Sequence, residues 1–138
     1  TRSLHDALPI FRKVHQFNVF CVNTPMQHAL ASYLQDPTPY LQLPDFYQAK
    51  RDFFRQGLAS TRLKPLPSQG SYFQCVDIRA VSDLSEPDFC QWLTREMGVA
   101  AIPLSAFYGD GFDQGVVRFC FAKQEATLAQ ALERLARL

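Results

Sequence analysis

The sequence lacks a charge excess, a long apolar run and a low-complexity tract. Its 138 residues include 14 Lys and Arg against 13 Asp and Glu, which leaves a net charge of +1. That balance argues against bulk electrostatic binding to nucleic acid or to an anionic membrane. No apolar run approaches the roughly 20 residues of a membrane-spanning helix. What remains is a globular chain that is long enough to bury a core of its own.

The four cysteines also lack the spacing of a metal site. None forms a C-x-x-C pair, and none lies at ligand spacing from a histidine. Cys75 and Cys120 lie in apolar runs, where a free cysteine behaves as a small buried hydrophobe. We therefore expect reduced thiols in a cytoplasmic protein, and no metal. The first residues do not show the pattern of a secretory signal.

The first ten residues have an unusual amino-acid sequence. Residues 3–10 read SLHDALPI, which matches the translation of a common sequencing adapter. We interpret residues 1–10 as a sequencing-adapter artefact and expect the natural polypeptide to extend upstream of Phe11. An ordinary amphipathic segment that matches by chance is the alternative. We give His5 and Asp6 no chemical role for this reason.

The pattern of apolar residues predicts an α+β fold. Thr24 is expected to cap a helix that begins at Pro25 and ends at the prolines that follow Asp36. A longer helix follows from Pro44, and Gly57 interrupts its last part at a cost of about 1 kcal/mol. The later elements are a strand over 71–78, a helix ending at Gly98, a strand over 99–102, a loop over 104–115, a strand over 116–122 and a helix over 127–138. This order predicts a short sheet covered by helices.

One arginine stands in the otherwise apolar run 116–122. Alternate residues of a strand share a face, so Arg118 lies on one face with Val116 and Cys120. An unpaired buried guanidinium costs on the order of several kcal/mol, so it needs a partner. That partner is either a carboxylate of this chain, such as Asp77 or Asp110, or a ligand carboxylate held by two parallel hydrogen bonds.

Four motifs carry a resemblance to a known family. They are VNTPMQ at 22–27, GSYF at 70–73, PLSAFYG at 103–109 and VRFCFA at 117–122. In this order and with these gaps they resemble the C-terminal part of class I and II pyridoxal-phosphate-dependent aminotransferases of fold type I. Four further segments are most similar to the bacterial methionine aminotransferase branch, which is related to kynurenine aminotransferases. These segments are FCVNTP, LPDFY, CQWL and GVAAIPLS. The resemblance covers Phe11 to Leu138.

The resemblance implies a domain organisation and an activity. Residues 11–40 would be the tail of a large pyridoxal-phosphate-binding domain, and residues 41–138 the small C-terminal domain. The full-length enzyme would move an amino group from methionine or an aromatic amino acid to a 2-oxo acid, as a cytoplasmic homodimer. Arg118 would hold the substrate carboxylate, and Phe20, with Asn23 nearby, would reach the active site of the partner subunit. The loop from Pro103 to Tyr108 would border the substrate side chain.

The resemblance also implies what this chain lacks. The family's Schiff-base lysine and the groups that hold pyridoxal phosphate lie upstream of the matching region. The lysines of this chain, at 13, 50, 64 and 123, do not stand in the family's lysine motif. We therefore assign no catalytic, cofactor-binding or metal residue, and we expect the chain alone to be inactive.

Two other functions remain open. A pyridoxal-phosphate-dependent β-lyase of the same fold would share the carboxylate-binding arginine. A sheet-faced RNA-binding module would instead stack bases on Tyr72, Phe73, Phe119 and Phe121. The charge of +1 and the absence of a basic stripe argue against the RNA module. We expect neither a nucleic-acid nor a membrane partner.

Overall fold

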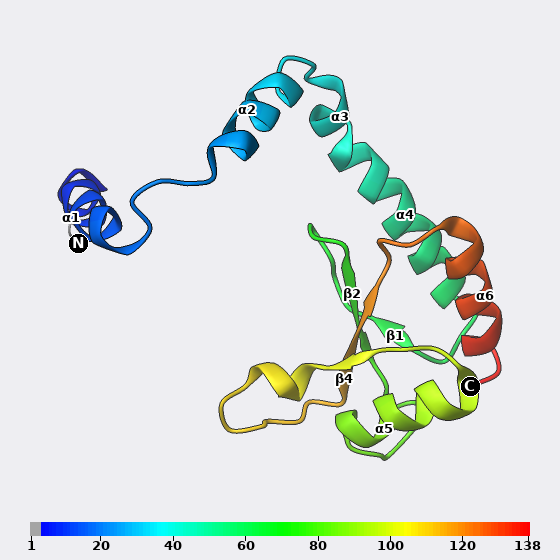
Figure 1. Ribbon diagram of the computed structural model, residues 1–138. Coiled ribbons are helices and arrows are strands. Elements are labelled where there is room, and N and C mark those ends of the chain that lie inside the picture. The colour runs from blue at the N-terminus through cyan, green and yellow to red at the C-terminus, as the bar shows by residue number, and fades with distance from the viewer. Residues whose placement is uncertain (1–3) are drawn as a thin grey trace. The chain divides into compact units, whose positions relative to one another are not determined.

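The computed structural model describes residues 4–138, with side chains from residue 7 onward (Figure 1). Residues 1–3 of the expected artefact lie outside the described residues, whereas residues 4–10 are helical. The chain divides into two compact units, of which the first ends at Leu41 and the second comprises Gln42–Leu138.

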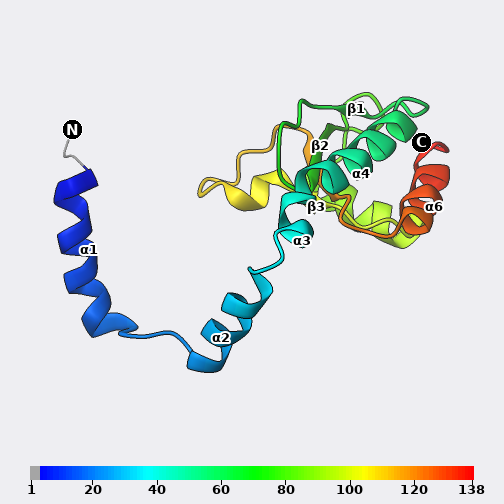
Figure 2. The same cartoon turned by 90° about the horizontal axis from the view of Figure 1, so that it is seen from above.

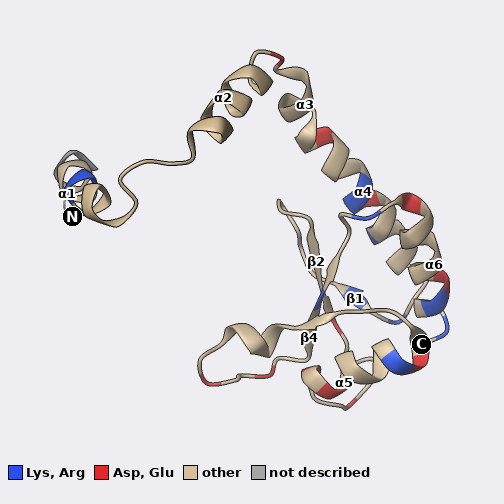
Figure 3. Ribbon diagram, viewed as in Figure 1, with Lys and Arg blue, Asp and Glu red and all other residues tan. Residues whose placement is uncertain are grey.

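The first unit consists of three helices. These are α1 (Leu4–Asn18), α2 (Thr24–Tyr33) and α3 (Thr38–Leu41). The side-chain oxygen of Asn23 accepts a hydrogen bond from the Met26 N–H at 3.2 Å, so Asn23 caps α2. The expected cap at Thr24 is wrong by one residue. α2 carries no charged side chain (Figure 3) and buries none of its residues.

The second unit combines helices with short strands. Its elements are α4 (Leu43–Leu58), β1 (Lys64–Pro65), β2 (Phe73–Asp77), α5 (Glu86–Trp92), the π-helical turn η1 (Leu93–Met97), β3 (Ile102–Pro103), the 3-10 turn η2 (Leu104–Phe107), β4 (Val116–Cys120) and α6 (Glu125–Leu135). The predicted α+β fold with a small sheet is confirmed. The strand expected over 99–102 is shorter and later, since only residues 102 and 103 pair with β4.

The four strands form one antiparallel sheet in the order β1-β2-β4-β3. β4 is central, and its register places Arg118 opposite Cys75 on β2 and opposite Ile102 on β3. Directly opposite residues share a face, so these three side chains project from the same side of the sheet.

The other side of the sheet forms the core. Val76, Val117 and Phe119 are at most 3% exposed. They belong to one cluster with apolar side chains of α4, α5 and α6. Phe119 and Phe121 are 3% and 1% exposed, so they cannot stack on a base. The proposed RNA-binding platform is therefore wrong.

Gly57 determines how closely α4 and α6 approach. The two helices lie side by side (Figures 1 and 2). A Cβ atom on Gly57 would lie 2.2 Å from the Cδ1 atom of Leu132, which projects from α6. The glycine expected to interrupt the last part of the helix lies in its last turn, where the absence of a Cβ atom permits this contact.

Candidate functional site

Arg118 projects from the middle of β4 between aromatic rings of two other elements. Its guanidinium carbon lies 3.9 Å from the ring centroid of Phe73 on β2. The same carbon lies 4.6 Å from the ring centroid of Phe107, at the end of η2. Both distances are those of a cation–π contact. The two rings hold the guanidinium without using its hydrogen-bond donors.

Arg118 has no anionic partner within the described residues. Its Nε atom is buried and makes no hydrogen bond to any of the described side chains or backbone groups. Asp77 instead accepts hydrogen bonds from the Nε atom of Arg79, at 3.0 Å to each carboxylate oxygen. The other expected partner, Asp110, accepts a hydrogen bond from the backbone of Phe112 at 3.1 Å. The interpretation of Arg118 as one half of a structural ion pair is wrong.

The Cys75 thiol beside Arg118 does not neutralise its charge. Cys75 lies directly opposite Arg118, and Cys120 follows it on the same face. Burial raises the pKa of the Cys75 thiol above its ordinary 9.0, against the opposing effect of the Arg118 charge. Cys75 is therefore a neutral thiol at pH 7 and does not serve as a counter-ion of Arg118.

A pocket of about 380 Å³ is lined by Arg118 on one side of the sheet and by residues of the core side, among them Phe119 and Leu128. Its lining is mainly apolar and includes Phe73 and Ile102 as well as the aliphatic side of α6. Lys123 and Arg134 contribute two further cations, and the lining contains no carboxylate. Apolar walls with a few placed polar groups are typical of small-molecule sites, and these polar groups favour a ligand with an anionic end.

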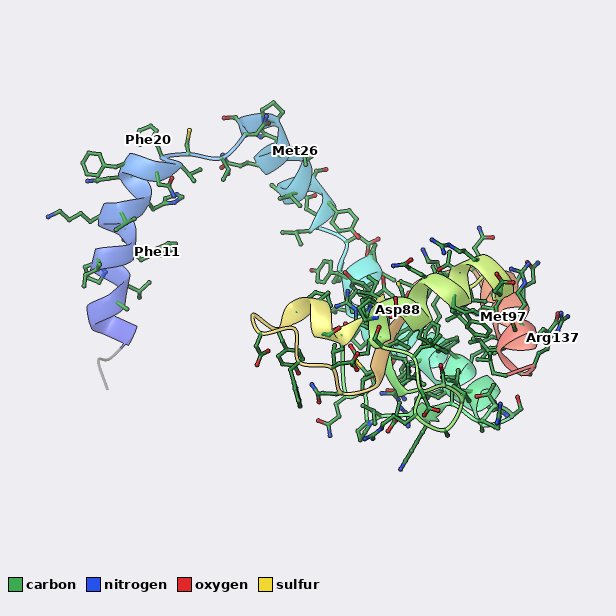
Figure 4. The ribbon with its side chains drawn as sticks, turned by 90° about the horizontal axis from the view of Figure 1, so that it is seen from below. Phe11, Phe20, Met26, Asp88, Met97 and Arg137 are labelled. Atoms are coloured by element: carbon green, nitrogen blue, oxygen red, sulfur yellow. The ribbon has the colours of Figure 1, made fainter. Side chains whose placement is uncertain are left out.

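Phe20 and Asn23 belong to the first unit. Phe20 follows α1, has a φ of +66° and is 77% exposed (Figure 4). A positive φ is unusual for a bulky residue and marks a constrained turn. The N–H groups of Val19 and Phe20 both donate to the carbonyl of His15, which fixes this turn. The side chain of Asn23 is occupied as the cap of α2. The expected contact of Phe20 and Asn23 with a partner subunit stays a prediction.

The described residues do not by themselves fit pyridoxal phosphate. That cofactor requires a lysine together with an acidic or basic partner for its ring nitrogen. The Nζ atom of Lys50 donates to the carbonyl of Lys123 at 2.6 Å, and Lys13 and Lys64 are exposed. Lys123 borders the pocket, where no carboxylate accompanies it. Among the side chains that the structure describes, from residue 7 onward, there is also no group of three His, Cys, Asp or Glu side chains that could hold a metal ion.

Sequence reasoning found the arginine but missed its aromatic contacts. Phe73 and Phe107 both occur in the quoted motifs, and only the three-dimensional arrangement shows that their rings contact one guanidinium. The alternation of β2 carried part of the signal, because Phe73 and Cys75 share a face and Cys75 pairs with Arg118. None of the helices in the described part of the chain combines the length and the apolar character that crossing a membrane requires.

The described residues thus form a small antiparallel sheet that helices cover on one face, with a cationic side chain, Arg118, on the other. The chain belongs to the class I and II aminotransferase family, whose model matches residues 6–135. It is 56% identical to methionine aminotransferase of Escherichia coli over 128 residues, which are 92% of this chain and 33% of that protein. Kynurenine–oxoglutarate transaminase 1 of Homo sapiens is 37% identical over 90% of this chain and 35% of its own length.

Solved structures agree with these sequence comparisons. A crystal structure from Escherichia coli, described as having a methionine aminotransferase function, matches with a TM-score of 0.85 and 55% identity over 92% of this chain. N-succinyldiaminopimelate aminotransferase of Mycobacterium tuberculosis matches with a TM-score of 0.76 and 32% identity over 88% of this chain. The matches cover 34% and 32% of those chains. The chain thus spans about a third of the length of its relatives.

Proposed function

We propose that the full-length protein is a pyridoxal-phosphate-dependent aminotransferase that moves an amino group from an amino acid of methionine or aromatic type to a 2-oxo acid. The names of the similar proteins support this reaction and this pair of substrate classes. The cofactor, bound mainly by residues upstream of this chain, supplies the electron sink. This chain supplies the group that recognises the substrate carboxylate.

The observation that carries the proposal is the unpaired guanidinium of Arg118. Its Nε atom is buried without a partner in the described chain, and its charge is not offset by a neighbouring carboxylate. A ligand carboxylate would satisfy both needs, because a guanidinium binds it through two parallel hydrogen bonds. The amino acid and the 2-oxo acid carry this carboxylate in the same place, so one residue serves both half-reactions.

The domain organisation is part of the proposal. Residues 41–138 form the small domain and residues 11–40 the tail of the large one, which is supported by the division of the chain between Leu41 and Gln42. Phe20, with Asn23 nearby, contacts the active site of the second subunit in a homodimer, which is supported by the 77% exposure of the Phe20 side chain. All four cysteines are free, which supports a cytoplasmic location.

The test uses the full-length enzyme with Arg118→Ala and a matched control, Arg134→Ala. Arg134 lines the same pocket, but its Nη1 atom donates to the carbonyl of Gly98 at 2.9 Å. Methionine is compared with 3-(methylthio)propylamine, the same amine without the carboxylate. Loss of a charged hydrogen-bonded pair is worth about 1.5–3 kcal/mol, so Arg118→Ala should reduce the preference for methionine by about 10–150-fold.

The cofactor absorbance distinguishes the outcomes. Arg118→Ala should leave the absorbance of bound cofactor nearly intact, and Arg134→Ala should retain the preference for methionine. Loss of the cofactor, or an unchanged preference in Arg118→Ala, would contradict the role of Arg118. Repeated turnover of cystathionine without an amino acceptor, with more than one equivalent of 2-oxo acid and of ammonia released per enzyme, would instead identify a β-lyase that uses the same arginine.

A further inference from the structure

Glu86 is a buried carboxylate outside the pocket of Arg118. It lies at the start of α5 and is 0% exposed. Its Oε2 atom accepts a hydrogen bond from the N–H of Ser105 at 2.5 Å. Its Oε1 atom accepts from the N–H groups of Gln114 and Val116, at 2.9 and 2.8 Å. A buried anion is costly unless it is fully hydrogen-bonded, so these three backbone donors are what permits a carboxylate here.

The three donors belong to the two ends of one loop. Ser105 lies in η2, where the loop begins, and Gln114 and Val116 lie where it enters β4. One carboxylate therefore accepts hydrogen bonds from both ends of the segment between β3 and β4 and holds these ends together. Asp113 adds a second connection, because it accepts from the N–H of Glu86 at 2.8 Å and from the N–H of Gly115 at 2.9 Å.

The closed loop carries one of the two rings that contact the guanidinium. Phe107 lies two residues after Ser105, and its side chain is 58% exposed. An exposed ring has little packing to hold it, so the position of Phe107 over Arg118 depends on the backbone that Glu86 fixes. Phe73, by contrast, lies within the sheet, where it pairs with Cys120.

We propose that Glu86 is a positioning residue for substrate binding: it fixes η2, η2 places Phe107 over the guanidinium of Arg118, and Arg118 is thereby held in the orientation that binds a carboxylate. This inference rests on the proposed function of Arg118. A positioned guanidinium binds a carboxylate better because less rotational freedom is lost on binding.

A double-mutant cycle in the full-length enzyme tests the chain of contacts. Glu86→Gln keeps the size of the side chain but replaces one acceptor oxygen by a donor amide. It should raise the KM for methionine about tenfold and change kcat less. In a Phe107→Ala background the same substitution should change the KM by less than about twofold, because the ring through which Glu86 acts is gone.

The control for general destabilisation is Gln74→Leu. Gln74 is also 0% exposed, and its side chain bonds to Arg55 and to the carbonyls of Leu66 and Cys75, away from the loop. This variant should lower the melting temperature and leave the KM unchanged. A KM that rises equally in Gln74→Leu would overturn the proposal, since the effect would then follow stability alone.

Further results decide between the possible failures. If Glu86→Gln leaves the KM unchanged, or if its effect is the same with and without Phe107, Glu86 has no positioning role. If Arg118→Ala raises the KM and Glu86→Gln does not, only this inference fails. If Arg118→Ala has no effect, the proposed function fails first. Should Glu86→Gln not fold, Asp113→Asn weakens the second connection of the loop. Asp113→Asn should raise the KM for methionine about threefold, and it should leave the KM unchanged in the Phe107→Ala background.

Discussion

The packing of α4 on α6 leads to a prediction about Gly57. In an exposed helix, replacing glycine by alanine stabilises the helix by about 1 kcal/mol. Here the added Cβ would lie 2.2, 2.8 and 2.9 Å from the Cδ1, Cδ2 and Cγ atoms of Leu132. Because the Cγ atom is among them, rotating the end of the leucine side chain does not relieve the contact.

The two effects have opposite signs, and their magnitudes decide the result. Overpacking of a core costs about 1–3 kcal/mol, and Leu132 is only 9% exposed, so the cost falls toward the upper end of that range. Subtracting the helix gain leaves a net loss of about 1–2 kcal/mol for Gly57→Ala. Urea denaturation at low protein concentration measures it, with Trp92, the single tryptophan of the chain, as the fluorescent reporter.

Leu132→Ala provides the internal control. Removing the leucine side chain removes the contact, so in this background Gly57→Ala should be neutral or stabilising. If Gly57→Ala raises the free energy of unfolding of the protein that keeps Leu132, the packing argument is refuted, because only the helix propensity would then explain the result.

Three further predictions concern surface, thiol and carboxylate groups. The exposed rings of Phe17 and Phe20, 83% and 77% accessible, should make the chain associate, and a monodisperse monomer in sedimentation would contradict this. Burial, and then the nearby carboxylate of α5, raises the pKa of Cys90 to about 11; iodoacetamide at pH 8 should therefore modify exposed Cys21 long before Cys90, as peptide mass spectrometry would show. Two backbone N–H groups hold the pKa of Asp113 below its ordinary 3.8. The stabilising effect of the Asp113 carboxylate is thus complete above pH 3.8 and is lost as the pH falls further. The difference in free energy of unfolding between wild type and Asp113→Asn should therefore shrink on acidification. A difference that stays constant with pH would contradict this role of Asp113.

The sequence was most informative where periodicity and burial coincide. The α4 helix begins within one residue of the expected Pro44, and α6 buries Leu128 and Leu132 on the apolar face that the spacing indicated. The run around Arg118 predicted both a strand and the face of the arginine correctly. These features depend on local patterns that a single sequence contains.

Features that depend on distant contacts could not be predicted in this way. Glu86 has the sequence position of an ordinary acidic residue in the first turn of a helix, and only the fold brings three loop N–H groups to it. Gly57 was expected only to weaken its helix, because the local sequence does not show that Leu132, 75 residues later, packs against it. The cap of α2 was displaced by one residue, since Asn23 and Thr24 are both favourable capping types.

The role proposed for Arg118 is to bind the carboxylate of the substrate. The most direct measurement is calorimetric titration of the full-length protein, and of Arg118→Ala, with 4-(methylthio)butanoate and with its neutral amide. The wild type should bind the carboxylate at least about tenfold more tightly than the amide, and the variant should bind both alike. A variant that keeps the preference for the carboxylate would contradict the account.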